Sequence, residues 1–94
     1  MPERRFDIQW PNGNEESCYS PSSIISDYLT AGESYPLKDF VELAERSLNE
    51  ASERVRAKYG YACSSAMDQL YKIKQSSTQF DQDPDALVIV KRIY

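Results

Sequence analysis

The chain has 94 residues, of which 40% are hydrophobic and 28% charged, a composition typical of one folded domain spanning residues 1–94 rather than a disordered segment. Fifteen acidic residues against eleven basic ones give a net charge of −4, which opposes non-specific binding to nucleic acid or anionic lipid. Because the sequence contains no histidine, a Cys-His catalytic pair within one chain is excluded.

No window of the sequence is long and apolar enough to span a bilayer, and no apolar segment follows the basic residues Arg4 and Arg5. We therefore expect no membrane segment and no signal peptide, and a cytoplasmic location. The sequence also lacks a metal-ligand cluster and a phosphate-binding loop, so we expect no metal, no cofactor and no nucleic-acid partner.

The first element predicted along the chain is a β-hairpin. Residues 5–10 alternate between polar and apolar side chains, which is typical of a half-buried strand. The turn that follows begins with Pro11, which cannot take the positive φ required by a two-residue type I′ loop. We therefore predict a type I turn with Gly13 in a left-handed bulge position. This register places Phe6 opposite Cys18, with Cys18 on the core face.

A short helix is predicted next. Ser20 is a suitable N-cap and Pro21 a suitable first helical residue, because that position needs no N–H donor. The helix should run to about Leu29 and be terminated by Gly32. Residues 33–35 should then form a connecting loop.

Two long amphipathic helices, Pro36 to Lys58 and Ala62 to Phe80, account for most of the apolar pattern. Their apolar residues recur at steps of three and four, which is the helical period. Gly60 separates the helices, so we predict an antiparallel helical hairpin.

The final element is a strand over Ala86 to Val90, which follows a polar linker and has high strand propensity. The predicted fold is therefore α+β: a β-hairpin, a short helix, a long antiparallel helical hairpin and a C-terminal strand, forming a small antiparallel sheet covered by helices. A 23-residue helix is about 34 Å long, whereas a six-residue strand spans only about 20 Å. One end of the helix pair, near Tyr59 or near Pro36, should remain uncovered. We therefore predict a homodimer.

The sequence suggests one chemically distinctive position. Cys63 lies at the start of the second long helix, where the helix dipole can lower the pKa of a thiol. Together with Cys18 it is a possible redox or ligand site, although packing in the core is the more common role of a free cysteine. We assign no catalytic residue.

Aromatic side chains supply a possible partner surface. Tyrosine and tryptophan are enriched at protein interfaces, although packing at the core edge is the more common role of most such residues. The candidates for this surface are Trp10, Tyr19, Tyr35, Tyr59 and Tyr61.

Several blocks of the chain resemble a known family. The blocks are Trp10-Pro11-Asn12-Gly13, Glu15 to Ser22, Tyr35-Pro36-Leu37, Asp39-Phe40 and Arg54 to Ser64. They resemble the short bacterial nitrogen-starvation response proteins, over about residues 5–70. The resemblance implies a role in nitrogen limitation and a gene located near that of a nitrilase-type hydrolase and other metabolic enzymes. It implies no catalytic residue.

Two functional hypotheses follow. The first is a non-enzymatic accessory or regulatory protein of nitrogen-limitation metabolism that binds a protein partner, such as a metabolic enzyme, through the sheet edge or the tyrosine-rimmed helix end. The alternative is a small enzyme or ligand-binding subunit that uses Cys63 at a helix N-terminus.

Overall fold

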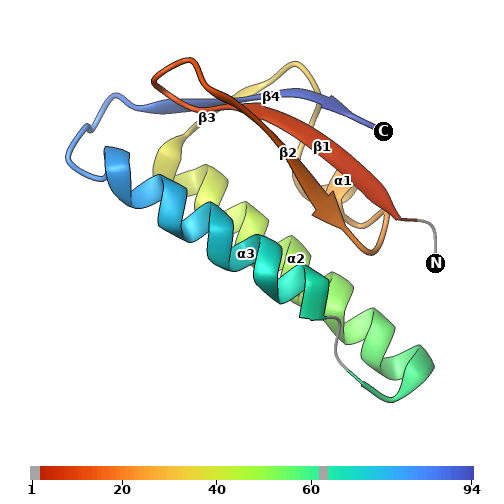
Figure 1. Cartoon of the computed structure of the whole chain (residues 1–94). Coiled ribbons are helices and arrows are strands. Elements are labelled where there is room, and N and C mark those ends of the chain that lie inside the picture. Colours follow the sequence, from red (N-terminus) through yellow and green to blue (C-terminus); the bar gives the residue numbers. More distant parts are fainter. Residues whose placement is uncertain (1–2, 62–63) are drawn as a thin grey trace.

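The computed structural model describes residues 3–61 and 64–94, and it combines a four-stranded antiparallel sheet with helices packed on one face (Figure 1). The elements follow the chain in the order β1 (Arg4–Gln9), β2 (Glu15–Ser20), α1 (Ile25–Tyr28), β3 (Ser34–Pro36), α2 (Leu37–Tyr59), α3 (Ser64–Ser77), the short 3-10 helix η1 (Thr78–Phe80) and β4 (Leu87–Ile93). The strand order is β2-β1-β4-β3, so the first and last strands lie side by side in the middle of the sheet. This arrangement confirms the predicted α+β fold.

The β-hairpin has the predicted register. Gly13 has φ of +90°, and its N–H donates to the carbonyl of Trp10 at 2.8 Å, closing the turn that begins at Pro11. Phe6 lies opposite Cys18, and both side chains are fully buried. Local turn chemistry is therefore sufficient to set which face of the hairpin enters the core.

The prediction for the first helix is wrong in its start. Ser20 is the last residue of β2, paired with Arg4, and its hydroxyl donates to the carbonyl of Ser22 at 2.8 Å instead of capping a helix. The helix α1 has only the four residues Ile25–Tyr28. Ser20 is the last paired residue of β2, and residues 21–24 form a turn before the first helical residue, Ile25.

The predicted loop at residues 33–35 is also wrong, because Ser34–Pro36 forms the edge strand β3. Tyr35 pairs with Val88 of β4. The preceding turn is held to the same strand, since the N–H of Gly32 donates to the carbonyl of Val90 at 2.7 Å. A proline is tolerated in this short strand because β3 lies at the edge of the sheet.

The two long helices form the predicted antiparallel hairpin (Figure 1). The helix α2 ends at Tyr59 and is capped by Gly60, whose φ is +84° and whose N–H donates to the carbonyl of Arg56 at 2.7 Å. The second helix is shorter than predicted, because regular α-helix ends at Ser77 and η1 follows. The predicted first residues of that helix, Ala62 and Cys63, lie outside the described residues.

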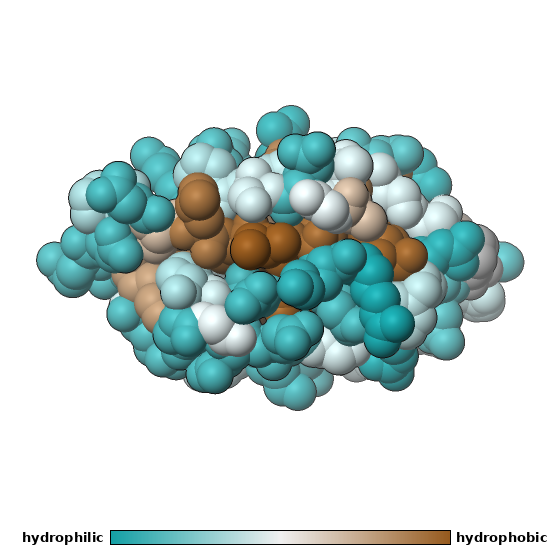
Figure 2. Space-filling view, turned by 90° about the horizontal axis from the view of Figure 1, so that it is seen from above, coloured by the Kyte–Doolittle hydropathy of each residue, from teal (hydrophilic) through white to brown (hydrophobic). Residues whose placement is uncertain are grey.

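The core lies between the sheet and the helices. Its residues come from β1, β2, β4, α1, α2 and α3, and they include Phe6, Ile8, Trp10, Cys18, Ile25, Leu29, Phe40, Ala44, Leu48, Ala66, Leu70, Ile73, Val88 and Val90. None of the helices in the described part of the chain lies on the opposite face of the sheet (Figure 1). Figure 2 shows this face as a narrow apolar strip bordered by polar side chains. Leu87 contributes to the apolar surface of the molecule, since its side chain is 49% exposed.

The helical hairpin is longer than the sheet above it, as the lengths of the elements require. The molecule extends 40 Å along its longest axis, and the end of the hairpin that carries Tyr59 projects beyond the sheet (Figure 1). The other end lies close to the sheet, where the N–H of Leu37 donates to the carbonyl of Ala86 at 3.1 Å. The uncovered end is therefore the one near Tyr59.

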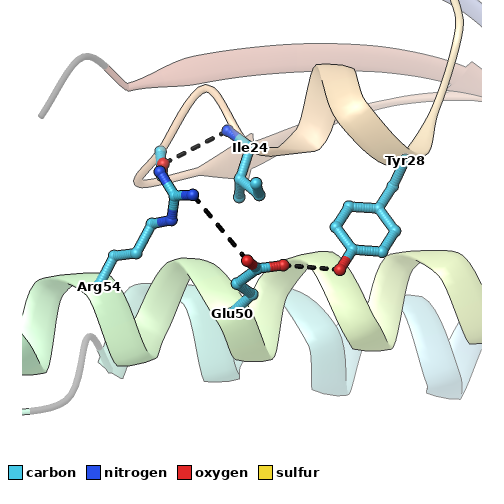
Figure 3. Close-up of polar contacts among 5 residues, drawn as sticks. Ile24, Tyr28, Glu50 and Arg54 are labelled. Carbon is cyan, nitrogen blue, oxygen red and sulfur yellow. Dashed lines mark hydrogen bonds and ion pairs between the residues drawn. The ribbon is translucent and has the colours of Figure 1, made fainter.

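The helix α1 is attached to the middle of α2 through side chains (Figure 3). The hydroxyl of Tyr28 donates to Oε2 of Glu50 at 2.6 Å, and the same carboxylate lies 3.9 Å from the guanidinium of Arg54. The hydrogen bond to Glu50 raises the pKa of Tyr28, because ionisation of the phenol would remove the donor and place two anions together. This contact holds α1 against the helical hairpin.

Candidate functional site

The edge of β2 carries a row of backbone groups directed away from the sheet. In an antiparallel pair, successive residues direct their backbone N–H and carbonyl groups alternately toward the partner strand and away from it. Cys18 is paired with Phe6 of β1, so the backbone groups of Glu15, Ser17 and Tyr19 are directed outward. The N–H of Tyr19 follows this rule, since it donates to Oε1 of a glutamine on α3 at 3.0 Å. The strand edge and α3 therefore face each other across a polar boundary.

The glutamine on α3 is Gln69, and it is only 9% exposed. The N–H of Tyr19 needs an oxygen acceptor, so the Oε1 of Gln69 must point toward the strand and Nε2 must point away. No acceptor among the described residues bonds to this buried Nε2. An unsatisfied buried donor costs about 1–3 kcal/mol, and within residues 3–61 and 64–94 the Nε2 of Gln69 is the one buried side-chain nitrogen or oxygen without a partner.

A groove of about 470 Å³ follows the boundary between β2 and α3. Its walls are formed by Glu16, Ser17, Gln69, Tyr71, Lys72, Gln75 and Ser76. Neighbouring hollows continue it toward Glu15 at one end and toward Arg5 at the other. The groove therefore carries carboxylates at the end near Glu15, whereas the opposite end carries the cations Arg5 and Lys72 together with the carboxylate of Asp68.

The projecting end of the helical hairpin, which we call the hairpin tip, is residues 54–61. Its aromatic residues are Tyr59, 52% exposed, and Tyr61, 66% exposed, with ring centroids 6.2 Å apart. The ammonium of Lys58 lies 5.4 Å from the centroid of the Tyr59 ring. Aromatic rings beside cations at an exposed end form a surface suited to protein contacts.

The structure does not bring the five predicted aromatic residues together. Trp10 is 5% exposed, its Nε1 donates to Glu16 at 3.0 Å, and its ring packs against two phenylalanines of the core. Tyr35 is half-buried, and its hydroxyl accepts a bond from the N–H of Thr30 at 2.8 Å. Tyr19 borders the groove, and Tyr59 lies with Tyr61 at the hairpin tip. These two tyrosines offer the largest aromatic surface of the five.

Cys18 lies in the core and is fully buried. Burial raises the pKa of the Cys18 thiol, and the negative charge of Glu16 raises it further. The thiol lies 3.9 Å from Oε2 of Glu16, toward which it donates. A thiol in this environment stays protonated and is a poor nucleophile. Cys63 lies outside the described residues, so a role for it stays a prediction, as does its proximity to Cys18.

The sequence contained a signal for the groove that the sequence-based reasoning missed. Gln69 lies between Ala66 and Ile73, on the apolar stripe of α3, where a polar side chain must find partners inside the protein. Only the structure shows that its partner is the outward N–H of Tyr19.

The described residues lack both a membrane-spanning helix and a cluster of metal ligands. None of the helices within 3–61 and 64–94 is long and apolar enough to cross a membrane. The same residues contain no group of three or more histidine, cysteine, aspartate or glutamate side chains that could hold a metal ion.

The whole chain was compared with known proteins. Neither a protein of curated function nor a solved structure matches it. A family model described as nitrogen starvation-induced protein NitG matches residues 5–93. Because this match includes all of the strands and helices except Arg4, the first residue of β1, the chain belongs to the nitrogen starvation-induced NitG family, and its role is related to nitrogen starvation.

Proposed function

We propose that this chain is a non-catalytic accessory or regulatory protein of nitrogen-limitation metabolism, which acts in the cytoplasm by binding a protein partner through its hairpin tip. A metabolic enzyme is the class of partner that we infer. Membership of the NitG family supports the metabolic context. The exposed aromatic pair Tyr59 and Tyr61 is the observation that carries the proposed mode of action.

The hairpin tip has the composition of a binding surface. Tyrosine and arginine are enriched at interface hot spots, because tyrosine buries a large rigid ring and arginine donates several hydrogen bonds from one planar group. Arg54 and Arg56 lie on the last two turns of α2 beside the tyrosines. Their ion pairs with Glu50 and Glu53 are long, at 3.9 and 3.8 Å, and exposed. Such pairs contribute little to stability, so both guanidinium groups are available to a partner.

The projection of the tip beyond the sheet adds a geometric reason. The tip does not pack against the sheet (Figure 1). A second protein can therefore cover it without disturbing the core. Truncation of a hot-spot tyrosine typically costs 2 kcal/mol or more, which is about a thirtyfold change in affinity.

The test begins with the tagged full chain used as bait in extracts of nitrogen-limited cells, followed by purification of the protein recovered at equal stoichiometry. That partner is then titrated against the wild type and the double variant Tyr59→Ala/Tyr61→Ala. Tyr94→Ala is the matched control, because Tyr94 is 51% exposed and follows β4 at residue 94, away from the tip (Figure 1). We expect at least a tenfold loss of affinity for the double variant alone. Equal affinity of all three proteins would exclude the tip as the binding surface.

The alternative, a small enzyme or ligand-binding subunit that depends on Cys63, is separated by the same titration. Under our proposal Cys63→Ser binds the partner as tightly as the wild type. Loss of partner binding in Cys63→Ser, with selective alkylation of Cys63 in the native protein, would favour the alternative.

A further inference from the structure

We propose that the outer edge of β2 is a homodimer interface, in which β2 of a second copy pairs antiparallel with β2 across a two-fold axis at Ser17. The two sheets then join into one sheet of eight strands. This inference concerns a different surface from the hairpin tip and does not depend on the proposed function.

The edge of β2 is open for pairing at its centre. The backbone N–H and carbonyl of Ser17 face outward, and the Ser17 side chain is exposed. An unpaired strand edge is a template for another strand unless charge, proline or a covering segment blocks it. No proline lies within Glu15–Ser20, so an antiparallel second copy can form two backbone hydrogen bonds at Ser17.

The charges along this edge are complementary to those of a second copy in the antiparallel direction. A two-fold axis at Ser17 places Glu15 of one copy opposite Tyr19 of the other. The guanidinium of Arg5 lies over the Tyr19 ring, 5.9 Å from its centroid, and therefore close to the incoming Glu15 carboxylate. Within one chain this pair does not form, because Arg5 is opposite Tyr19 whereas Glu15 is opposite Gln9.

The spacing of the two layers also suits a second copy. Strands lie about 4.8 Å apart and packed helices about 8–10 Å apart, so one helix covers about two strands. The four strands and the helices α2 and α3 follow this ratio. Continuing the sheet at β2 therefore continues the helical layer, with α3 beside α3 of the second copy.

Two side chains of α3 lie where this arrangement adds burial or polar partners. Tyr71 of α3 is 64% exposed and lines the groove. Gln69, whose buried Nε2 has no partner among the described residues, lines the hollow beside Arg5 and Tyr19 at the end that receives Glu15 of the second copy. A 94-residue chain buries only about 60–65% of its unfolded surface by itself, so association at this edge adds burial that the monomer lacks.

Sedimentation velocity of the full chain between about 1 and 100 μM tests the interface. Ser17→Pro removes the outward N–H at the two-fold axis, and proline is tolerated at such an edge position. Ser34→Pro is the matched control, because Ser34 is the exposed first residue of β3 at the opposite edge. We expect dimers for the wild type and Ser34→Pro, and monomers with an unchanged circular dichroism spectrum for Ser17→Pro. A monomeric wild type, or a dimer that survives Ser17→Pro, would overturn the proposal.

Charge reversal provides a second test that does not alter the backbone. Glu15→Arg and Arg5→Glu each place like charges together at both symmetry-related contacts, so each should raise the dimer dissociation constant about tenfold or more. The double variant Glu15→Arg/Arg5→Glu restores the attraction and should restore dimerisation. Failure of the double variant to recover, with both single variants folded, would contradict the antiparallel arrangement.

Discussion

The packing of Trp10 allows a quantitative test of the core. Phe40 and Phe80 both contact the Trp10 ring, with centroid distances of 5.9 and 6.0 Å, but their burial differs. Phe40 is fully buried and meets the indole edge to face, at an interplanar angle of 84°. Phe80 is half-buried and stacks on the indole at 19°.

These environments predict different costs of truncation. Phe40→Ala leaves a cavity in the core and should reduce the free energy of unfolding by about 3–5 kcal/mol. Phe80→Ala loses the stacking contact with Trp10 and the hydrophobic free energy of a half-buried ring. It should reduce the free energy of unfolding by about 1–2 kcal/mol. A 94-residue domain has a total stability of roughly 5–14 kcal/mol, so the first change removes a large share of it. The corresponding fall in Tm for Phe40→Ala is on the order of 20 °C.

Urea denaturation at one protein concentration measures both changes. Trp10 is the only tryptophan of the chain, so its fluorescence reports the transition directly. The native emission should be blue-shifted and should move to longer wavelength in both folded variants. A cost below about 1 kcal/mol for Phe40→Ala, or equal costs for the two variants, would refute this description of the core.

Three further predictions concern titration, reactivity and the helix end. The hydrogen bond from Arg92, at 2.6 Å, holds the pKa of Asp7 below its ordinary value, so Asp7 contributes stability above about pH 4 that is lost as the pH falls through its lowered pKa. Thermal melts should show Asp7→Asn to be less stable than the wild type at pH 7, and the difference should disappear near pH 2. In a Cys63→Ser background, mass spectrometry should find Cys18 unalkylated by iodoacetamide in the native protein at pH 8 and fully alkylated in urea, and rapid native alkylation would contradict its burial. Gly60→Ala should cost about 1 kcal/mol, because the left-handed φ of +84° is strained for alanine, although no described residue other than the two chain neighbours has an atom within 4 Å of the added Cβ. Chemical denaturation that shows no loss of stability would contradict this account of the cap.

The elements that the sequence predicts correctly are those determined by local patterns. The turn at Pro11 is fixed by its own residues, because proline excludes one turn type and Gly13 supplies the positive φ of another. The extent of α2 follows from a regular apolar stripe and from Gly60 at its end. The element lengths predict that one end of the helix pair is uncovered, whereas only the structure shows that this is the end near Tyr59.

The elements that the sequence does not predict depend on distant partners. Only three residues form β3, including Pro36, and their extended conformation is defined by pairing with β4 more than fifty residues later. Ser20 has the side chain of a typical N-cap, but it pairs with Arg4 of β1 and is therefore part of the sheet. Secondary-structure propensity predicts neither the strand β3 nor the inclusion of Ser20 in β2, because both arise from pairing with distant strands.

The candidate surfaces also depend on tertiary packing, which local sequence patterns do not predict. Periodicity does not show that Trp10 is enclosed while Tyr59 and Tyr61 are exposed, because exposure of an aromatic residue depends on the elements packed around it. The groove at β2 requires knowledge of strand order, which places β2 rather than β1 at the edge. Gln69 was visible as a polar residue on an apolar stripe, but its pairing with Tyr19 was not.

The most direct test of the central claim, that the protein acts by binding a partner through its hairpin tip, is hydrogen exchange of the purified complex. Residues 54–61 form an exposed helix end in the free chain, and their amides should exchange rapidly there. Our account predicts that the partner slows exchange in peptides covering Tyr59 and Tyr61 and leaves β4 unchanged. Slowed exchange confined to the sheet, with no change at residues 54–61, would contradict it.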